Sequence, residues 1–327
     1  MKAIVQTEYG SADVLRLKEV DRPVVSDHGV LVRVRAASVD AGTWHMMRGT
    51  PFLVRLIYGG LRQPKATIPG SALAGQVEAV GPAVTQFQPG DEVFGDVSES
   101  GFGAFAEYAC VPAPALAPKP ANLTFEAAAT VAVSALTALQ ALRDLGQLQP
   151  GQRVLILGAS GGVGSFAVQL AKVFGAEVTA VCRSPKVDMV RQLGADQVID
   201  YTQTDVTQPS QPYDLILDMA AYRSCFDYWP ALTPTGTYVM VGGSMPRLFQ
   251  AMLLGPLVSK FTHRQVKCLV SKLKSVDLLT LRDLLEAGQI TPVIDRTYPF
   301  SEVPAAIRYL EQRQVRGKVV ISISAGH

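Results

Sequence analysis

The segment from residue 154 to residue 164 combines residue types that can bind a phosphate. It reads Val-Leu-Ile-Leu-Gly-Ala-Ser-Gly-Gly-Val-Gly, which predicts a buried strand that turns sharply on glycines and opens a helix. At such a turn, free backbone N–H groups and the positive end of the helix dipole can hold a pyrophosphate. Gly161 would let the backbone approach the ligand, and Gly164 would let the helix pack closely on the strand. An ordinary glycine-rich turn is the alternative, and the strand–turn–helix context argues against it.

The end of the next predicted strand bears on the choice of dinucleotide. A site for NAD usually carries an Asp or Glu here for the ribose 2′-hydroxyl, whereas a basic group accommodates the 2′-phosphate of NADP. No acid lies between Thr179 and Val187, but Arg183, Ser184 and Lys186 do. The sequence therefore favours NADP(H) over NAD(H), with a merely solvated, basic strand end as the alternative.

A second group of reactive side chains lies in one short segment nearer the N-terminus. Asp40 could orient a substrate through hydrogen bonds or, alternatively, cap a turn. His45 or Arg48 could polarise an oxygen that gains negative charge, although Arg48 could equally be a surface charge. Together with Trp44, these residues are the candidates for the substrate side of a site.

Composition excludes several classes of protein. The chain has 327 residues, 48% of them hydrophobic and 18% charged, which rules out a disordered, collagen-like or coiled-coil protein. This length suggests about two domains. A net charge of +2, with no long Lys/Arg run, argues against nucleic acid as a partner.

The cysteines and the apolar segments bear on location. The four cysteines are widely spaced, so we expect single buried thiols in a reducing compartment. The N-terminus enters a strand at once, which predicts no signal peptide. The most apolar stretch, Ala251–Val258, contains Gly-Pro and is too short to span a bilayer. These features predict a cytoplasmic protein without a membrane span.

Two patterns of elements divide the chain. The first 120 or so residues read as short strands between turns, which predicts an all-β, barrel-like domain. A helix is expected from Thr124 to Arg143, and strands then alternate with helices, which predicts a parallel sheet. The expected strands are 153–157, 177–181, 197–199, 215–218, 237–241 and an edge strand at 265–270, and the expected helices between them are 163–174 and 187–193. Helices at 278–287 and 304–312 and a strand at 318–323 follow.

Several motifs occur in a fixed order along nearly the whole chain. They are Pro69–Gly81, Phe87–Gly95, Leu193–Asp196 with Ile199–Tyr201, Gly242–Gly243 and Arg316–Val320. This set resembles the medium-chain dehydrogenase/reductase superfamily, and within it the zinc-less quinone oxidoreductase branch. The resemblance implies an α/β fold in which a Rossmann doubly wound parallel sheet is inserted into a β-rich GroES-like barrel domain. We accordingly expect a GroES-like catalytic domain at 1–122 and 271–327 and a Rossmann NADP(H)-binding domain at 123–270.

The resemblance also implies roles for the residues that match its motifs. The pyrophosphate would be held by Ser160, Gly161, Gly162, Val163 and Gly164. The adenosine 2′-phosphate would be surrounded by Arg183, Ser184, Lys186 and Tyr201, with Arg313 as a further basic contact. The nicotinamide side would be lined by Gly242, Gly243 and Ser244.

Departures from the family pattern affect the metal and the substrate side. Zinc-dependent relatives carry a Cys near Asp40, a His-Glu pair after Gly70 and a four-Cys lobe, all of which are missing here, so no zinc is expected. Zinc-less relatives commonly carry Asn at position 40 and acids at positions 43 and 72, where this chain has Asp40, Thr43 and Ala72. The motif expected as Asp-Asn-x-Gly reads Asp218-Met219-Ala220-Ala221.

Three functional hypotheses follow. The first is a zinc-independent reductase that transfers hydride from NADPH to a quinone or an α,β-unsaturated carbonyl, acceptors whose delocalisation spreads the developing charge. The second is a catalytically weak NADP(H)-binding protein with a structural or regulatory role. A short-chain dehydrogenase is disfavoured because no Tyr has a Lys four residues later.

An apolar segment at residues 245–254 predicts a helix with excess apolar surface. It could line a pocket for a hydrophobic acceptor, or it could be a dimer interface or plain core. The edge strand at 265–270 could pair across a two-fold axis, so we expect a homodimer.

Overall fold

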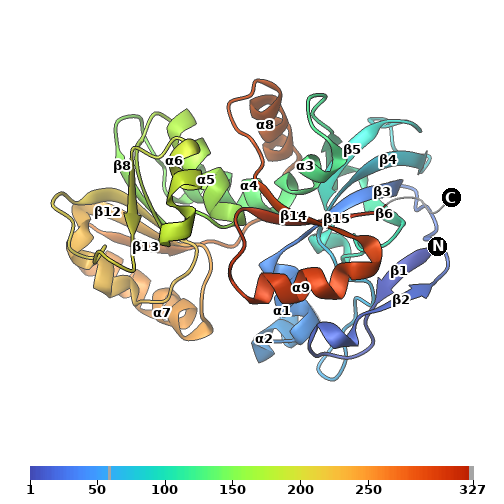
Figure 1. The fold of residues 1–327 in the computed structure, drawn as a ribbon, viewed down its shortest axis with the longest axis horizontal. Coiled ribbons are helices and arrows are strands. Elements are labelled where there is room, and N and C mark those ends of the chain that lie inside the picture. Colours follow the sequence, from blue (N-terminus) through green and yellow to red (C-terminus); the bar gives the residue numbers. More distant parts are fainter. Residues whose placement is uncertain (58–59, 324–327) are drawn as a thin grey trace. The chain divides into compact units, whose positions relative to one another are not determined.

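The computed structural model describes residues 1–57 and 60–323 (Figure 1). Contacts between residues divide the chain into two units. One contains Met1–Val133, Leu273–Gly288 and the chain from Pro292 onward, and the other contains Ser134–Lys272 and Gln289–Thr291. The expected domain boundaries lay at 122/123 and 270/271, whereas the units change at 133/134 and 272/273.

The central unit is built on a parallel sheet. In sheet order its described strands are β10 (Gln197–Asp200), β9 (Glu177–Cys182), β8 (Arg153–Leu157), β11 (Tyr213–Asp218), β12 (Leu232–Met240) and β13 (Gln265–Cys268). Numbered along the chain, this order is 3-2-1-4-5-6, the order of dinucleotide-binding Rossmann sheets. The helices of this unit are α5 (Gly162–Val173), α6 (Val187–Gln192) and α7 (Met245–Phe261), and α4 (Val131–Gln140) lies across the boundary between the units.

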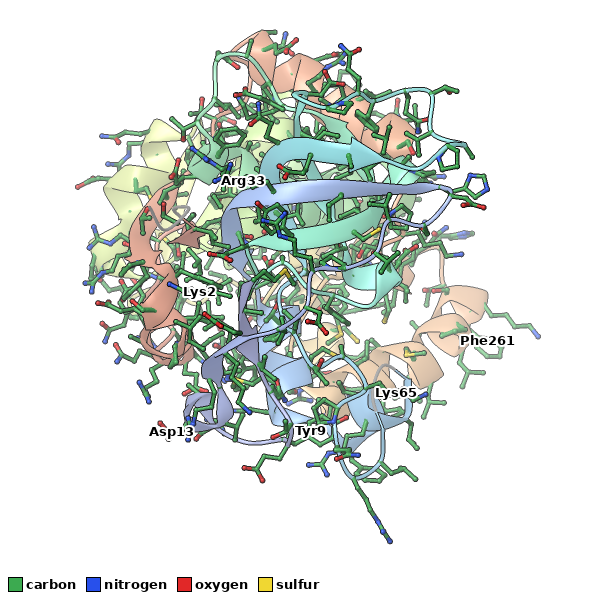
Figure 2. All side chains as sticks on the ribbon, turned by 90° about the vertical axis from the view of Figure 1, so that its right-hand side faces the viewer. Lys2, Tyr9, Asp13, Arg33, Lys65 and Phe261 are labelled. Carbon is green, nitrogen blue, oxygen red and sulfur yellow. The ribbon has the colours of Figure 1, made fainter. Side chains whose placement is uncertain are left out.

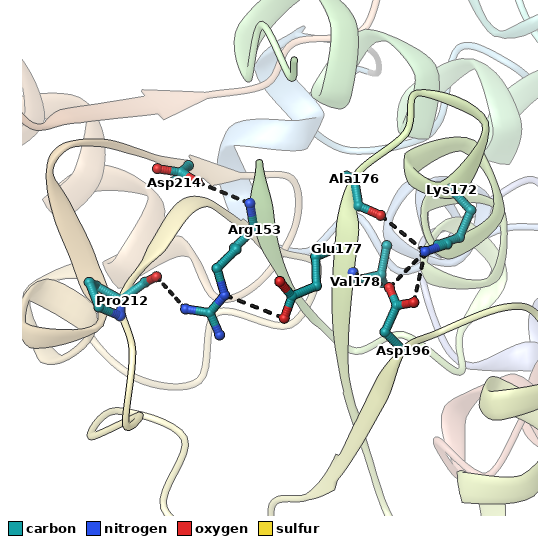
Figure 3. Close-up of polar contacts among 8 residues, drawn as sticks. All are labelled: Arg153, Lys172, Ala176, Glu177, Val178, Asp196, Pro212 and Asp214. Atoms are coloured by element: carbon teal, nitrogen blue, oxygen red, sulfur yellow. Dashed lines mark hydrogen bonds and ion pairs between the residues drawn. The ribbon is translucent and has the colours of Figure 1, made fainter. Parts of the chain in front are cut away.

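Polar contacts hold α5 against the sheet (Figure 3). Lys172 Nζ, in the last turn of α5, donates to the Asp196 carboxylate at 2.8 Å and to the Ala176 carbonyl at 3.1 Å. Asp196 also accepts the backbone N–H of Val178 at 2.7 Å, which connects the start of β10 to β9. On β8, the Arg153 N–H donates to Asp214 at 3.0 Å. The contacts of Lys172 fix the end of α5 against β9 and β10 and therefore the direction in which its N-terminus points.

The other unit combines segments from both ends of the chain. Its main sheet follows the order β14 (Ile294–Pro299), β15 (Lys318–Ser322), β3 (Gly29–Val39), β4 (Ala72–Val80), β5 (Glu92–Asp96) and β7 (Leu116–Pro118), with β6 (Tyr108–Pro112) also paired to β3. A separate antiparallel pair is β1 (Lys2–Val5) and β2 (Arg16–Glu19). Its helices are α1 (Ala41–Arg48), α2 (Phe52–Ile57), α3 (Phe125–Ala129), α8 (Ser275–Glu286) and α9 (Val303–Glu311). A buried apolar core that includes Val32, Phe105 and Ile321 joins these segments.

Three sequence expectations need correction. The N-terminal part is not all β, because α1 and α2 follow β3, and α1 ends at Gly49, whose φ of 59° suits glycine. The helix expected from 124 to 143 is broken into α3 and α4 and ends in a π-helical turn at Ala141–Leu145. The helix expected at 245–254 continues through Gly255 and Pro256 to residue 261. Within this helix, Gly255 lies so close to β13 that a Cβ would approach Val266 to 3.1 Å.

Candidate active site

The glycine turn between β8 and α5 has the geometry of a phosphate cradle. A Cβ on Gly164 would lie 2.3 Å from the Gly158 carbonyl oxygen, so α5 packs on the strand more closely than any side chain allows. A Cβ on Gly161 would meet only that same oxygen, at 3.5 Å, so the turn leaves open space there. Gly161 precedes α5 without a side-chain cap, and the first N–H groups of a helix have no partner within it. The residues present therefore fit a dinucleotide pyrophosphate.

These two glycines allow fold and binding to be separated. Gly164→Ala should lower the free energy of unfolding by about 1–3 kcal/mol, because the methyl group overlaps backbone atoms. Gly161→Ala should leave the melting temperature nearly unchanged but weaken NADPH binding at least tenfold, because its methyl group enters the space for the pyrophosphate. Thermal melting and NADPH titration of both variants test this. If wild type and Gly161→Ala bound NADPH equally well, the assignment of the pyrophosphate to this turn would be wrong.

The ends of β9 and β10 carry the residues expected at the adenosine 2′-phosphate. The Arg183 Nε–H donates to the Tyr201 hydroxyl at 2.5 Å, and this hydrogen bond raises the pKa of Arg183. Ser184 donates its hydroxyl proton to Asp200, and hydrogen bonds from Ser184 and then Thr202 lower the pKa of this carboxyl. A cavity of about 510 Å³ lies beside them and is lined by Ser184, Val187, Asp188, Val198, Ile199, Asp200, Gln203 and Thr204. The structure thus places Arg183, Ser184 and Tyr201 at the neighbouring ends of β9 and β10, with Arg183 bonded to Tyr201 and Ser184 to Asp200.

Asp200 is a residue that the sequence reasoning missed. No acid was found after β9, but the parallel pairing of β10 with β9 places Asp200 opposite Cys182. Its signal was the Ile199–Tyr201 motif, of which only Tyr201 was assigned a role. At the expected position of the adenosine ribose an acid would repel a 2′-phosphate, so Asp200 would oppose the expected effect of Arg183.

The loops after β11 and β12 are fixed by a buried carboxyl group. Asp218 is 1% exposed, accepts the N–H groups of Ala220 and Ala221 at 3.0 and 2.6 Å, and accepts the Tyr238 hydroxyl at 2.7 Å. Burial raises the pKa of Asp218 above its usual range. A Cβ on Gly243 would lie 2.3 Å from the Ala221 Cβ, so the two loops touch where the nicotinamide side was expected. Gly242, Gly243 and Ser244 follow β12 directly.

The candidate substrate-side residues of the other unit lie on or next to α1, and three of them have close partners. Trp44 Nε1–H donates to Glu311 at 2.6 Å, and the Arg48 guanidinium is paired with the same carboxylate at 2.8 Å. His45 Nδ1–H donates to the Thr50 carbonyl at 2.8 Å. Glu311, at the end of α9, is a second residue that sequence reasoning missed, since it lies far from its partners along the chain.

Asp40, the fourth candidate, belongs to a buried polar cluster. It precedes α1 without a side-chain cap bond among the described residues, so the capping alternative does not apply. Its carboxylate is paired instead with Lys318 of β15, and both side chains are buried, at 7% and 3% exposure. Ser38 and Ser71 donate to the same carboxylate at 3.3 and 3.0 Å.

The cluster explains two departures from the family pattern. Thr43 contacts the Ser71 hydroxyl at 3.3 Å, and Ala72 lies between Ser38 and Asp96 in the sheet register. The acids that the family pattern would have at positions 43 and 72 are therefore replaced by a hydroxyl beside Ser71 and by a methyl group in the strand between Ser38 and Asp96. Asp40 supplies the negative charge that Lys318 requires.

Asp96, at the end of β5, gives this cluster a pH dependence. Burial, and then the nearby Asp40, raises its pKa from the ordinary 3.8 to about 6, against hydrogen bonds from Ser98. The folded state binds this proton more tightly than the unfolded chain, so stability should fall as pH rises from about 4 to about 6.

Asp96→Asn should remove this fall in stability and raise the free energy of unfolding at pH 7.5 by about 1–3 kcal/mol. Denaturant unfolding of both proteins between pH 4 and 7.5 tests this prediction, and Asp188→Asn, at an exposed position, is the control. If Asp96→Asn had the same dependence of stability on pH as wild type, the prediction would be wrong.

The described residues contain no group of three or more His, Cys, Asp or Glu side chains that could hold a metal ion. The four cysteines are free thiols, and burial raises the pKa of Cys182 to about 11. No described helix is long and apolar enough to cross a bilayer. Arg313 lies beyond α9 with a φ of 57°.

Comparison with known proteins agrees with this geometry. Residues 26–121 match the model of the alcohol dehydrogenase GroES-like domain, and residues 193–321 match a zinc-binding dehydrogenase model. A chloroplastic NADPH-dependent alkenal/one oxidoreductase of Arabidopsis thaliana is 33% identical over 98% of this chain and 79% of its own length. The 2-methylene-furan-3-one reductase of Solanum lycopersicum is 34% identical over the same shares. The structure of a Coxiella burnetii quinone oxidoreductase has a TM-score of 0.87, at 28% identity and 99% coverage of both chains.

The chain belongs to the medium-chain dehydrogenase/reductase superfamily, in its quinone oxidoreductase-like branch. The expected fold class, a Rossmann sheet inserted into a GroES-like domain, is confirmed.

Proposed function

We propose that this protein is an NADPH-dependent, zinc-independent reductase of quinones or α,β-unsaturated carbonyls. The observation that carries the proposal is the glycine cradle at the start of α5, in a sheet of dinucleotide-binding order. Relatives named as an NADPH-dependent alkenal/one oxidoreductase and a 2-methylene-furan-3-one reductase support the acceptor class. When bound, NADPH supplies the hydride.

The residues of this chain bind the cofactor and position the acceptor. In this proposal the first turn of α5 holds the pyrophosphate, and Arg183 and Lys186 attract the 2′-phosphate. Asp218 fixes the loops that carry Gly242 and Gly243 beside the nicotinamide. Asp40 directly precedes α1 and is held by Lys318, Ser38 and Ser71, so in this proposal it positions the helix and does not touch the substrate.

Charge that develops on the acceptor oxygen is spread by conjugation in a quinone or enone and stabilised by donors on α1. The His45 ring is held by its Nδ1–H, which donates to the Thr50 carbonyl, so Nε2 is the ring nitrogen left for the acceptor. Arg48 and Trp44 are held in place by Glu311.

A weak catalyst that mainly binds NADP(H) is the second candidate. One observation favours it: Trp44, Arg48 and Asp40 all direct their polar atoms at protein partners. Turnover distinguishes the two candidates.

Oxidation of NADPH by the purified protein, with 1,4-benzoquinone or a 2-alkenal in EDTA, tests the proposal. Rapid turnover that chelation does not diminish supports the reductase, and a strong preference for NADH would overturn the NADP assignment. Saturable NADPH binding without turnover on either acceptor would favour the binding protein.

We also propose a cytoplasmic homodimer. Four free thiols fit a reducing compartment, and β13 is an edge strand that can pair with a second copy. Light scattering after size-exclusion chromatography tests the dimer, and a monomer mass would refute it.

A further inference from the structure

Helix α7, which connects β12 to β13, has an exposed apolar face. Its exposed residues are mostly apolar and cover about half of the helix circumference; they are Pro246, Phe249, Met252, Leu253, Leu254, Pro256, Leu257, Lys260 and Phe261. Leu253 is 68% exposed and Phe261 is 81% exposed. Figure 2 labels Phe261 at the end of this helix.

The opposite face of α7 is apolar as well and packs on its own sheet. Ala251 is 2% exposed, and Gly255 lies so close to β13 that a Cβ would approach Val266 to 3.1 Å. A helix that is apolar on all sides is normally covered on all sides. Within the described residues, the outward face of α7 is not covered, so the sequence maintains an apolar surface that the fold of one chain does not need.

The chain segment that contains α7 carries charge of one sign. The stretch from residue 228 to residue 276 contains no Asp or Glu, and its Lys and Arg residues are Arg247, Lys260, Arg264, Lys267, Lys272 and Lys274. Two of these serve the fold, because Arg264 donates to the Leu232 and Thr233 carbonyls and Lys267 to the Leu145 carbonyl. Lys260 is exposed on the apolar face itself, and the exposed His263 follows the helix.

The positive charge distinguishes two partners that could cover the apolar face of α7: a second copy of the chain or a membrane surface. A second copy that met this face across a two-fold axis would bring the two Lys260 side chains together, and α7 itself carries no acid to offset them. An anionic bilayer surface attracts the same basic residues and accepts the apolar side chains between its headgroups.

We propose that α7 (Met245–Phe261) binds in the plane of an anionic membrane surface, with Phe249, Leu253 and Leu257 inserted among the headgroups. The helix lies on the bilayer and does not cross it. This association does not depend on the proposed reductase activity.

Flotation of the full-length protein with phosphatidylcholine vesicles, with and without phosphatidylserine, tests the proposal. We expect the protein to float with phosphatidylserine vesicles and to stay in solution with phosphatidylcholine alone. Leu253→Glu/Leu257→Glu should reduce the bound fraction at least tenfold, and Lys260→Glu several-fold. Val24→Glu, at a position that is 89% exposed in the other unit, should bind like wild type.

Thermal melting and NADPH titration confirm that each variant is folded. Absence of binding to phosphatidylserine vesicles, or equal binding to both vesicle types, would overturn the proposal. A dimer that Leu253→Glu/Leu257→Glu converts to a monomer, together with absence of flotation, would make the face a subunit interface. A raised KM for benzoquinone with unchanged flotation would assign it to an acceptor pocket instead.

Discussion

Replacing Asp40 with asparagine should lower the free energy of unfolding by about 3–5 kcal/mol. The substitution removes the carboxylate that is paired with Lys318 and leaves the buried ammonium group, 3% exposed, without this counterion. The family pattern that this chain resembles has Asn at position 40 together with acids at positions 43 and 72, which this chain replaces with Thr43 and Ala72, so an Asn at position 40 would stand here without those acids. Denaturant unfolding at neutral pH measures it.

Two further variants distinguish a lost ion pair from a local distortion. Lys318→Met in the Asp40→Asn background should recover most of the stability, since a buried pair can be replaced by apolar and neutral groups at little cost. Thr43→Asp in that background should recover part, because it returns a carboxylate to the cluster. If Asp40→Asn unfolds like wild type, Lys318 has another counterion and the assignment fails.

Replacing Arg183 with glutamate should weaken NADPH binding by about 10- to 100-fold and leave NADH binding unchanged or stronger. The guanidinium is the charged donor beside Tyr201, and a charged hydrogen bond is worth about 1.5–3 kcal/mol. A glutamate would repel the 2′-phosphate and could accept the hydroxyls of an NAD ribose instead. Dissociation constants for both dinucleotides, measured by fluorescence titration, give the change.

Asp200 provides the opposite test at the same place. Asp200→Asn removes a negative charge beside Ser184 and should tighten NADPH binding several-fold, with little effect on NADH. Arg223→Glu, at an exposed ion pair with Asp205, is the matched control and should change neither dissociation constant. Equal losses for NADPH and NADH in Arg183→Glu would mean that this residue holds the fold and not the 2′-phosphate.

Sequence patterns predicted the parts of the fold that depend on neighbours along the chain. The strand Arg153–Leu157 was predicted at its observed bounds, and the start of α5 within one residue, because buried strands and glycine turns are local signals. The same signals located Gly164 and Arg183.

The parts that were missed depend on contacts between distant segments. Lys318 lies 278 positions from Asp40, and Glu311 lies 267 positions from Trp44. Only the pairing of β15 with β3 brings Lys318 to Asp40, and spacing within one segment does not reveal it. Helix α1 was missed because its residues Ala41–Arg48 follow a run of strands and lack a clear apolar period.

The pairing of Asp40 with Lys318 also orders events during synthesis. At roughly 5–20 residues per second, Lys318 leaves the ribosome between about 15 and 55 seconds after Asp40. During that time the chain holds an acid with no cation to bury it against, and β3 lacks its neighbour β15. The dinucleotide-binding unit is nearly continuous in sequence and can fold in this interval. The β-rich unit therefore cannot complete its sheet, or neutralise Asp40, until β15 with Lys318 has been synthesised.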